Sequence, residues 1–483
     1  MRAHAPCAVL AALAIAAPAS AQPFAFTPLI VEGEPLENDG RMLLDVNVEF
    51  DLSDAGQVAA LLFVADDERD DERLVVVLED GAAPTVRAVG GFLSGVGGAI
   101  GFDNIRINNA ADLAYTARYR HPSNAILTRL VFDSPLAPPE TVIDEADGQF
   151  DDLGGSRPLD LSDNGDLVYS VIRNDAALTN EIVSWNPDTM DVLVATEGSA
   201  LGSGVYSSLT SIRAAADGTF MLDVFAGPNA FNLNRDLVRY IPNGVTVPYP
   251  NPVAPVVIDS TGQPPVLGGE TTILRSPASV PSGEVVYLAT IEDSPAVPAI
   301  TLADAIFRYV ASTDSIMPLV VEGDIAPDAG VFTSIAAVRA NSNGLVVFEA
   351  DTDAGEPGLF ALDPTGTITP ILREDEPLAG GTFTDIREFE LNESNLLAIS
   401  GGVRFDKGPL RDLIATTDLS ALVATDCPVD FAEPTATLDI ADVVAFLQLF
   451  GASDPAADLG APTGTFDIAD VITFLQLFGA GCP

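Results

Sequence analysis

The chain has 483 residues, of which 70 are acidic and 22 basic, so its formal net charge at pH 7 is −48. Such a chain repels nucleic acid and anionic membrane surfaces, which excludes both as partners. At the same time, 47% of the residues are hydrophobic, too many for an intrinsically disordered chain. We therefore expect a folded, soluble protein that attracts cations.

The first 21 residues have the pattern of a secretory signal peptide. Arg2 is followed by the apolar run AVLAALAIAAPAS, and Ala19-Ser20-Ala21 has the A-x-A form of a cleavage site. No later apolar run approaches the roughly 20 residues that a membrane helix needs. The mature protein is therefore predicted to be secreted, either extracellular or associated with the cell envelope, without a membrane span.

Histidine is nearly absent from the mature chain. His4 belongs to the predicted signal peptide, which leaves His121 in the turn-like segment RYRHPSN. Without a second histidine, Ser–His–Asp catalysis and multi-histidine zinc sites are not expected. We interpret His121 as a solvated loop residue, and the sequence identifies no catalytic residue.

The long segment 29–424 is predicted to consist of short strands. Val, Leu, Ile and Phe are grouped in short runs that are separated by Gly, Pro, Asn and Asp. One pattern, a polar turn followed by a strand, recurs seven times at spacings of 55, 54, 53, 65, 61 and 51 residues. The turn position that requires a positive φ is occupied by Gly56, Ala111, Gly165, Gly218, Gly283, Gly344 and Asn395.

The repeats predict a propeller. Each unit holds about four strands and cannot bury both faces alone, whereas seven units arranged radially close a ring and protect most strand edges. We therefore predict a mainly β protein, with a seven-bladed β-propeller at 29–424 followed by a small α-helical domain. Six or eight blades, or an array of two-sheet sandwiches, are the alternatives. The repeats resemble those of planctomycete-type secreted tandem-repeat proteins with an N-x-x-G turn, a family that offers no catalytic residues to match.

Small acidic clusters recur in the loops of these repeats. They comprise Glu32 and Glu34, Glu322 and Asp324, and Glu374, Asp375 and Glu376. Paired carboxylates can serve glycoside cleavage or bind calcium. A catalytic site usually breaks the symmetry of a repeat, however, whereas these clusters keep it. We interpret them as solvated loop ends, with calcium or ligand contact and catalysis as the alternatives.

The chain ends in a duplicated segment. LDIADVVAFLQLFGA and FDIADVITFLQLFGA lie 28 residues apart, and each predicts a helix between an Asp N-cap, Asp439 or Asp467, and a Gly. We expect the two helices to pack on each other through their apolar stripes. The stripes comprise Ile440, Val443, Val444, Leu447 and Phe450 in the first copy and Ile468, Val471, Ile472, Leu475 and Phe478 in the second, widened by Phe446, Leu449, Phe474 and Leu477.

This tandem of an acidic loop and a helix resembles a dockerin, a calcium-binding module that attaches secreted proteins to a cohesin-bearing scaffold. With its flanking cysteines and final GCP, the tail is most similar to the dockerin-like anchor domains of planctomycete-type secreted proteins. The resemblance implies a dockerin-like domain at 425–483 and a cohesin-like or envelope protein as its partner. The Ca²⁺ ligands it implies are Asp430, Asp439, Asp442, Asp458, Asp467 and Asp470.

The loops depart from a standard calcium loop. Positions 3 and 5, which carry oxygen ligands in the standard loop, hold Ala432 and Pro434 in the first copy. The last acid also comes one position late. We therefore expect any Ca²⁺ binding to be weak, and helix capping by the same aspartates is the alternative.

Two cysteines remain after signal-peptide removal, and they bracket the duplicated segment. In an oxidising compartment, Cys427 and Cys482 are predicted to form a disulfide, with two free thiols as the alternative. Closing a loop of this length stabilises a small domain by roughly 4 kcal/mol in the chain-entropy model.

Three hypotheses for function follow. The first is a secreted, non-enzymatic recognition or scaffold propeller attached to a partner or to the envelope by its tail. The second is a component of an extracellular polysaccharide-degrading system, in which the propeller binds or cleaves a glycan. The third is a structural envelope protein whose tail is a sorting signal.

Overall fold

The structure is a computed structural model of the 483-residue chain. It describes residues 24–36, 41–65, 71–91, 98–152, 157–188, 192–201, 204–215, 218–229, 232–242, 256–259, 270–279, 284–293, 300–310, 315–327, 330–353, 357–405, 408–423, 429, 431–432, 440–460 and 465–480.

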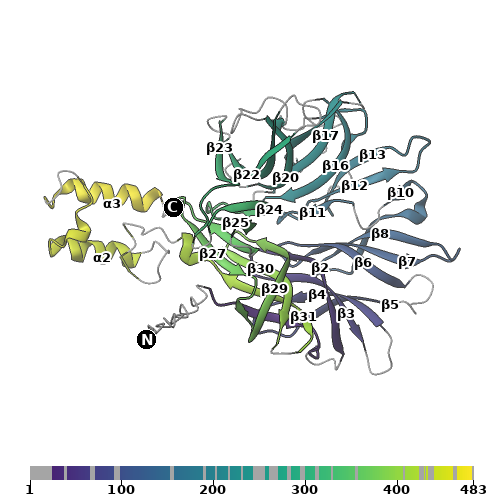
Figure 1. The fold of residues 1–483 in the computed structure, drawn as a ribbon, viewed down its shortest axis with the longest axis horizontal. Coiled ribbons are helices and arrows are strands. Elements are labelled where there is room, and N and C mark those ends of the chain that lie inside the picture. Colours follow the sequence, from purple (N-terminus) through teal and green to yellow (C-terminus); the bar gives the residue numbers. More distant parts are fainter. Residues whose placement is uncertain are drawn as a thin grey trace, which may run out of the picture.

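Over these residues, seven antiparallel sheets of four or five strands are arranged around a common axis as the blades of a propeller (Figure 1). The prediction of a mainly β, seven-bladed propeller followed by a few helices is confirmed. Within the sheets most strands that are consecutive in the chain are neighbours, because short hairpins connect them.

The strands of blades 1 to 4 are as follows. Blade 1 comprises β2 (Met42–Leu52), β3 (Val58–Ala65), β4 (Asp71–Leu78) and β5 (Thr85–Gly91). Blade 2 comprises β6 (Ala99–Ile107), β7 (Leu113–Arg120), β8 (Ile126–Asp133) and β9 (Glu140–Asp144), followed by the short 3₁₀ helix η1 (Glu145–Asp147). Blade 3 comprises β10 (Phe150–Asp152), β11 (Leu159–Leu161), β12 (Leu167–Arg173), β13 (Asn180–Trp185) and β14 (Val192–Thr196). Blade 4 comprises β15 (Ala200–Leu201), β16 (Gly204–Ala214), β17 (Phe220–Asn229), β18 (Asn232–Tyr240) and β19 (Val256–Asp259).

The remaining strands form blades 5 to 7. Blade 5 comprises β20 (Glu270–Ser279), β21 (Val285–Asp293), β22 (Ile300–Val310) and β23 (Ser315–Val321). Blade 6 comprises β24 (Phe332–Ala340), β25 (Val346–Thr352), β26 (Gly358–Leu362) and β27 (Ile368–Arg373). Blade 7 comprises β28 (Pro377–Leu378), β29 (Gly381–Leu391), β30 (Leu396–Arg404) and β31 (Leu410–Asp418), with β1 (Thr27–Val31) as its outer strand.

Strand β1 closes the ring. It pairs antiparallel with β31, so the start of the described chain completes the last blade. The register joins Thr27 to Thr416 and Val31 to Leu413. In the same region, the Thr417 hydroxyl donates a hydrogen bond to the Ala25 carbonyl at 2.9 Å. Closure therefore covers the edge that β31 would otherwise expose.

The core lies between blades, and strand periodicity divides it. Alternate residues of a strand point to opposite faces of the sheet. In β3, Ala59 and Leu61 pack in a cluster with blade 2, whereas Ala60 and Leu62 pack in a cluster with blade 7. Blade 1 thus fills two interfaces, which explains why β3 consists of consecutive apolar residues.

The turns have the predicted backbone. In the described turns, φ is positive at Gly56 (81°), Ala111 (59°), Gly165 (78°), Gly218 (78°), Gly344 (80°) and Asn395 (63°). The turn position of blade 5, Gly283, lies outside the described residues. Alanine at position 111 adopts a left-handed conformation that is unfavourable for a residue with a Cβ.

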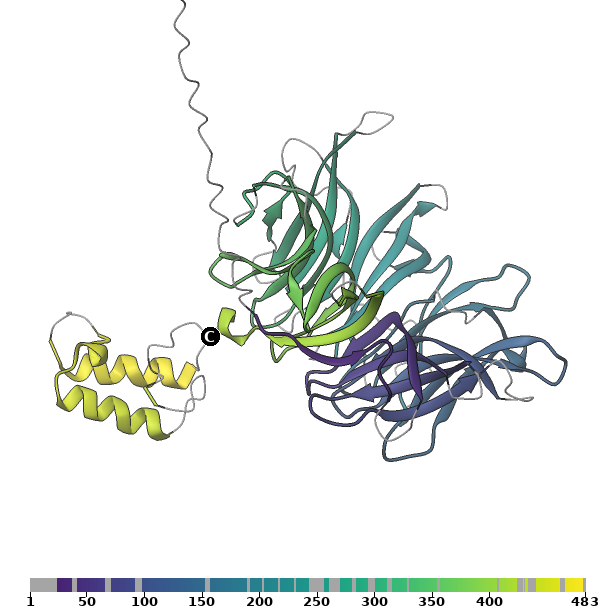
Figure 2. The same ribbon diagram turned by 60° about the horizontal axis from the view of Figure 1, so that its bottom comes forward.

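The C-terminal part is helical. A short helix α1 (Ser420–Val423) follows the last blade, and the duplicated segment forms α2 (Ile440–Gly451), the 3₁₀ helix η2 (Pro455–Ala457) and α3 (Ile468–Ala480). Figures 1 and 2 show α2 and α3 side by side, outside the propeller. Both helices lie where the sequence predicted them. None of the helices in the described part of the chain has the length and apolar character that a bilayer crossing requires.

The helix pair has its own small core. The rings of Phe446 and Phe474 are stacked with centroids 4.1 Å apart and an interplanar angle of 8°. Val429 and Ala457 complete the buried cluster. The two Phe residues occupy matching positions of the two copies, so the core forms where the repeats face each other.

Candidate functional site

Charged side chains occupy one repeated position in the strands nearest the axis. This position lies five residues before the turn glycine and pairs in register with the residue eight positions later in the next strand. In blades 1 to 7 it is occupied by Asp51, Arg106, Asp160, Arg213, Ala278, Arg339 and Glu390. We name the six charged residues of this set the charged ring.

Ion pairs join members of the charged ring. Arg106 Nε lies 3.3 Å from an Asp160 carboxylate oxygen, and Arg213 Nη1 lies 3.1 Å from Glu390. Arg339 donates to Glu390 at 2.7 Å and to the neighbouring Glu388 at 2.9 Å. These contacts connect inner strands of different blades.

The aspartates of the charged ring also bind backbone groups of the next blade. Asp51 accepts a hydrogen bond from the Ile107 N–H at 2.8 Å, and Asp160 accepts one from the Ala214 N–H at 2.7 Å. Each carboxylate therefore connects its own blade to the following one.

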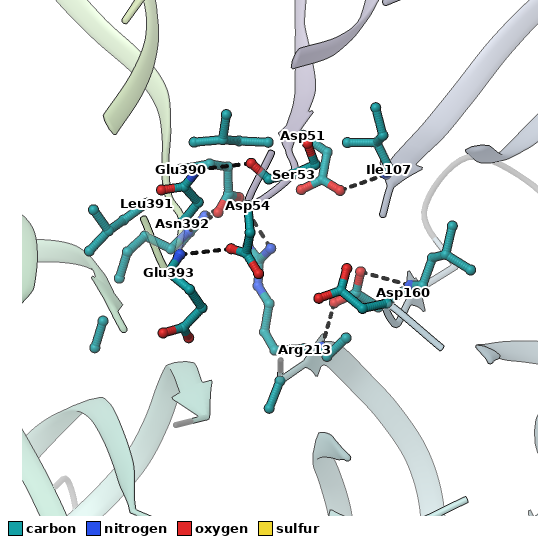
Figure 3. Close-up of a pocket in the computed structure, with 17 residues that line it drawn as sticks. Asp51, Ser53, Asp54, Ile107, Asp160, Arg213, Glu390, Leu391, Asn392 and Glu393 are labelled. Carbon is teal, nitrogen blue, oxygen red and sulfur yellow. Dashed lines mark hydrogen bonds and ion pairs between the residues drawn. The ribbon is translucent and has the colours of Figure 1, made fainter. Parts of the chain in front are cut away.

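Five members of the charged ring, all except Arg106, line a cavity of about 130 Å³ between inner strands of the propeller (Figure 3). The turns add Asp54, Asp163 and Glu393 to its lining, and we name these three residues the acidic rim. The Glu393 N–H donates to Asp54 at 2.7 Å. Asn109 donates to Asp54 and Asp163 at 3.2 and 2.8 Å. The acidic rim thus belongs to blades 7, 1 and 3.

The protonation properties of the carboxylates in this cavity differ. Burial raises the pKa of Asp51 to about 7, although Arg106 opposes the shift. Burial also favours a raised pKa for Glu390, but the guanidinium groups of Arg213 and Arg339 outweigh it and lower the pKa to about 2. Burial raises the pKa values of Asp163 and Glu393 in the acidic rim, and the charge of Asp54 adds to the shift. The cavity therefore offers cationic donors, ionised acceptors and one carboxyl, that of Asp51, which exchanges its proton near neutral pH.

The asparagine of the N-x-x-G turn bridges blades. Asn341 Oδ1 accepts from the Asn343 and Leu345 N–H groups and closes its own turn. Its Nδ2 donates to the Asn392 carbonyl of blade 7 at 2.9 Å. Asn392 makes the equivalent bond to the Ser53 carbonyl at 2.8 Å. The motif therefore joins neighbouring blades as well as shaping a turn.

The acidic loop clusters bind backbone groups of their own repeats. Glu32 accepts from the Asp412 N–H at 3.0 Å, and Glu322 accepts from the Asp304 N–H at 3.1 Å. Glu376 accepts from the Arg373 N–H at 3.0 Å. The bonds of Glu32 and Glu322 are equivalent in blades 7 and 5, and that of Glu376 closes its own turn, so these carboxylates hold loop ends.

In the tail, two predicted metal ligands fold the loops onto the helices. Asp442 Oδ1 accepts from the Phe431 and Ala432 N–H groups, both at 2.8 Å. Asp470 accepts from the Gly460 and Asp467 N–H groups at 2.7 and 2.9 Å. The hydrogen bonds from these two N–H groups lower the pKa of Asp470. Both carboxylates are buried and match each other in the two copies.

The other predicted ligands are placed as follows. Asp467 accepts from the Ala469 N–H at 2.7 Å, as an N-cap of α3 does, and Asp458 follows η2 and is half-buried. Asp430, Asp439 and both cysteines, Cys427 and Cys482, lie outside the described residues. No group of three His, Cys, Asp or Glu side chains placed to hold a metal occurs within the described ranges. Calcium binding and the disulfide remain predictions.

The apolar stripes of the two helices do not all pack inward. The sequence analysis expected Ile440, Val444 and Leu447 and their counterparts to form the contact between the helices. Instead, these six residues face solvent, whereas Phe446 and Phe474, which the sequence analysis added to widen the stripes, form the contact. The stripe residues Val443, Phe450, Val471 and Phe478 pack against this contact, as expected. The exposed fractions are 75, 48 and 55% for Ile440, Val444 and Leu447, and 69, 49 and 56% for Ile468, Ile472 and Leu475. We name these two sets the exposed stripes.

Sequence reasoning missed the charged ring, although a signal was present. The ring position recurs at the same spacings as the turn glycine, five residues upstream of it. It was overlooked because its side chains alternate in sign, so that no single residue type repeats.

Comparisons with known proteins give the following findings. No protein-family profile matches the chain, and no curated protein matches its sequence. Among solved structures, the chain is similar to an α-L-arabinanase of Penicillium chrysogenum in complex with arabinobiose, at 13% identity and a TM-score of 0.35, over 66% of this chain and 94% of that one. A gluconolactonase of Xanthomonas campestris matches at 12% identity and a TM-score of 0.30, over 67% of this chain and 99% of that one. A protein of unknown function from Dyadobacter fermentans matches at 11% identity and a TM-score of 0.35, over 81% and 99%.

Proposed function

We propose that the protein is a secreted, non-enzymatic recognition or scaffold protein, attached to a partner protein or to the cell envelope by a dockerin-like C-terminal domain. The observation that carries this proposal is the pair of exposed stripes on α2 and α3. In each helix three large apolar side chains, at positions i, i+4 and i+7, face solvent on matching surfaces of the two copies.

Exposed apolar surface of this kind favours a protein partner. Large apolar side chains in contact with water are unfavourable, and contiguous sets of them mark interaction sites. The sole ionisable side chain of α2 is the buried Asp442, and that of α3 is the buried Asp470, although the whole chain carries a net charge of −48. A cohesin-like protein with an apolar surface fits these helices, in the manner of an amphipathic helix that lies in a groove.

The propeller fits a role in recognition or display. The charged ring and the turn asparagines engage in bonds between blades, which gives a rigid scaffold. Such bonds hold each carboxylate in one arrangement. A rigid ring with a polar mouth suits the binding of a ligand without chemical change.

The attachment is tested with the mature chain, residues 22–483, immobilised and exposed to the envelope and secreted fractions of the source organism. The Val444→Glu/Ile472→Glu double variant places a charge in each exposed stripe and is expected to abolish capture of the partner. The control is Ile126→Glu, which adds a charge at an exposed apolar position of the propeller. Equal capture by the double variant and the wild type would contradict attachment through α2 and α3.

Calcium dependence is examined in the same experiment, with Ca²⁺ or with a chelator. Loss of the partner on chelation would support the predicted Ca²⁺ loops. An interaction that chelation leaves unchanged would still support attachment, but it would contradict the prediction that the loops need Ca²⁺. Capture of no partner in either condition would favour a tail that acts as a sorting signal.

A second candidate function is participation in an extracellular polysaccharide-degrading system. The observation in its favour is that Asp51 and Glu390 line one cavity with pKa values shifted in opposite directions. Glycoside cleavage uses a protonated and an ionised carboxyl in this way. The release of reducing ends from a panel of plant and microbial polysaccharides, with Asp51→Asn as the variant, distinguishes the two functions. Release that Asp51→Asn abolishes would replace the non-enzymatic proposal.

A further inference from the structure

A second cavity lies between blades 2 and 3. Its volume is about 310 Å³, at the lower end of the range found for small-molecule sites. Its walls come from the β8–β9 turn of blade 2 and from the β11–β12 and β13–β14 turns of blade 3. Asp163 of the acidic rim belongs to its lining, so this cavity adjoins the one lined by the charged ring.

Polar groups of this second lining are held in place by bonds to their own blades. Asn186 Nδ2 donates to Asp166 at 3.0 Å, and Asn186 Oδ1 accepts from the Asp188 N–H at 3.0 Å. Asp112 accepts from Asn108 Nδ2 at 3.2 Å. Because these groups already have a fixed arrangement, a ligand does not need to order them when it binds.

The charged side chains among the described residues of this lining are all acidic. They are Asp112, Glu140, Asp163 and Asp188. The cavity at the charged ring, by contrast, also contains the guanidinium groups of Arg213 and Arg339. Electrostatic complementarity therefore favours a cationic ligand over an anionic one between blades 2 and 3.

The uncharged part of the lining selects among cations. Asn164, Asn186 and Ser134 can each donate and accept hydrogen bonds, as the hydroxyl groups of a sugar also do. Pro138 and Pro187 are exposed and add apolar surface, which suits the C–H face of a sugar ring. A ring that carries both hydroxyl groups and an ammonium group complements all three kinds of lining.

We propose that the cavity between blades 2 and 3 binds an amino sugar, a glucosamine unit with a free ammonium group. The carboxylates neutralise the ammonium group, the amides and the serine bind hydroxyl groups, and the prolines contact the ring. This inference rests on the recognition role proposed above for the propeller, and it names the chemical class of the ligand.

The experiment is calorimetric titration of the mature full chain with glucosamine at about pH 6.5, where the amino group is protonated. Glucose and glucuronate have the same ring with no charge and with a negative charge, and cyclohexylamine has the positive charge without hydroxyl groups. Glucosamine is expected to bind at least about tenfold more tightly than each of the three. Equal or tighter binding of any of them would overturn the proposal, as would the absence of glucosamine binding up to about 10 mM.

One variant locates the site by blocking it. Ala137 is exposed in the β8–β9 turn and lines the cavity, so Ala137→Arg adds bulk and a positive charge there. This variant is expected to weaken glucosamine binding at least about tenfold while the thermal transition of the propeller is retained. Ala82→Arg is the matched control, because Ala82 has the same backbone bond in the β4–β5 turn of blade 1 and lies outside this cavity. Unchanged binding in Ala137→Arg would contradict the position.

A second variant tests the role of charge. Asp112→Asn/Asp188→Asn removes two negative charges with little change in side-chain shape. It is expected to weaken glucosamine binding at least about tenfold and to leave any glucose binding within about twofold. Asp80→Asn, at an exposed position of the β4–β5 turn, is the control. Unchanged glucosamine binding in the double variant would overturn recognition of the ammonium group.

Failure of this inference is distinguishable from failure of the proposed attachment. The Val444→Glu/Ile472→Glu variant is expected to bind glucosamine as the wild type does, since its substitutions lie on α2 and α3. A wild-type chain that binds glucosamine but captures no partner would reject the attachment alone. A chain that captures its partner but does not bind glucosamine would reject the amino-sugar site alone.

Discussion

The propeller and the helix pair are both built by repetition, but their repeats use polar and apolar residues in opposite ways. In the propeller, repeated polar residues point towards the axis and the turns and bind neighbouring blades. In the helix pair, the repeated aspartates are buried and the repeated apolar residues face solvent. In a closed ring of seven units the repeated polar groups bind neighbouring units, whereas a pair of units leaves apolar surface that a partner protein can cover. Repetition therefore gives stability in one region and a surface for association in the other.

The largest expected effect concerns the independence of the two regions. Phe446→Ala removes one of the two stacked rings at the centre of the helix pair, which should destabilise it by about 3–5 kcal/mol. Calorimetry should then show loss of the transition of the tail and an unchanged transition of the propeller. A shift of the propeller transition would show that the two regions unfold together. Leu136→Ala, at a fully exposed position of blade 2, is the control.

The next prediction concerns the bonds between blades. Asn341 is buried, and Asn341→Ala removes its bonds to blade 7 and to its own turn, with an expected cost of about 2–3 kcal/mol. Asn341→Ser should cost less, because the serine of blade 1, Ser53, closes its turn through Oγ. Denaturant unfolding followed by near-UV circular dichroism measures both variants. Equal costs for Ala and Ser would assign the whole effect to the bond between blades.

Acidity should act oppositely on the two regions. The pKa of Asp51 is raised to about 7 and that of Asp45 to about 6, in both cases chiefly by burial. Between pH 4 and pH 7 the folded propeller therefore binds more protons than the unfolded chain, and its free energy of unfolding falls as pH rises, by roughly 3 kcal/mol from Asp51 alone. The pKa of Asp470 is lowered, so its contribution to the tail is present above pH 4 and is lost as pH falls further.

Thermal scans from pH 3 to pH 8 test this contrast. The transition temperature of the propeller should rise from pH 8 to pH 5, and Asp51→Asn, which resembles the protonated form, should flatten that rise. Below about pH 4.5, ionised Glu390, with its pKa of about 2, opposes further stabilisation. A propeller that is most stable at pH 8 would show that Asp51 and Asp45 are ionised in the folded protein.

The smallest effect concerns a single turn. Ala111 has a positive φ of 59°, at a position where most other blades have glycine. Ala111→Gly relieves this conformation at some cost in chain entropy, and it should stabilise the propeller by about 0.5–1 kcal/mol. Ala110→Gly, one residue earlier in the same turn, should instead be neutral or destabilising. Destabilisation by Ala111→Gly would show that the methyl group of Ala111 makes contacts that outweigh its backbone strain.

The sequence by itself determined the propeller, its number of blades and the two terminal helices. Turn chemistry is local, since a positive φ restricts a position to residues such as Gly and Asn, and the seven spacings could be read directly. The sequence also predicted that each helix follows an acidic loop, because Asp442 and Asp470 occupy the same position in the two copies.

Only the tertiary structure decided which residues meet. The charged ring unites residues that are more than 300 positions apart, such as Asp51 and Glu390, and nothing local indicates that they line one cavity. Likewise, a helical stripe indicates which residues share one side of a helix but not which of them a partner helix covers. Phe446 lies in the core and Ile440 does not, because the ring of Phe446 stacks on that of Phe474 in the other helix. Local backbone chemistry repeats along the chain and is visible in the sequence, whereas contacts between units depend on how the units are arranged in space.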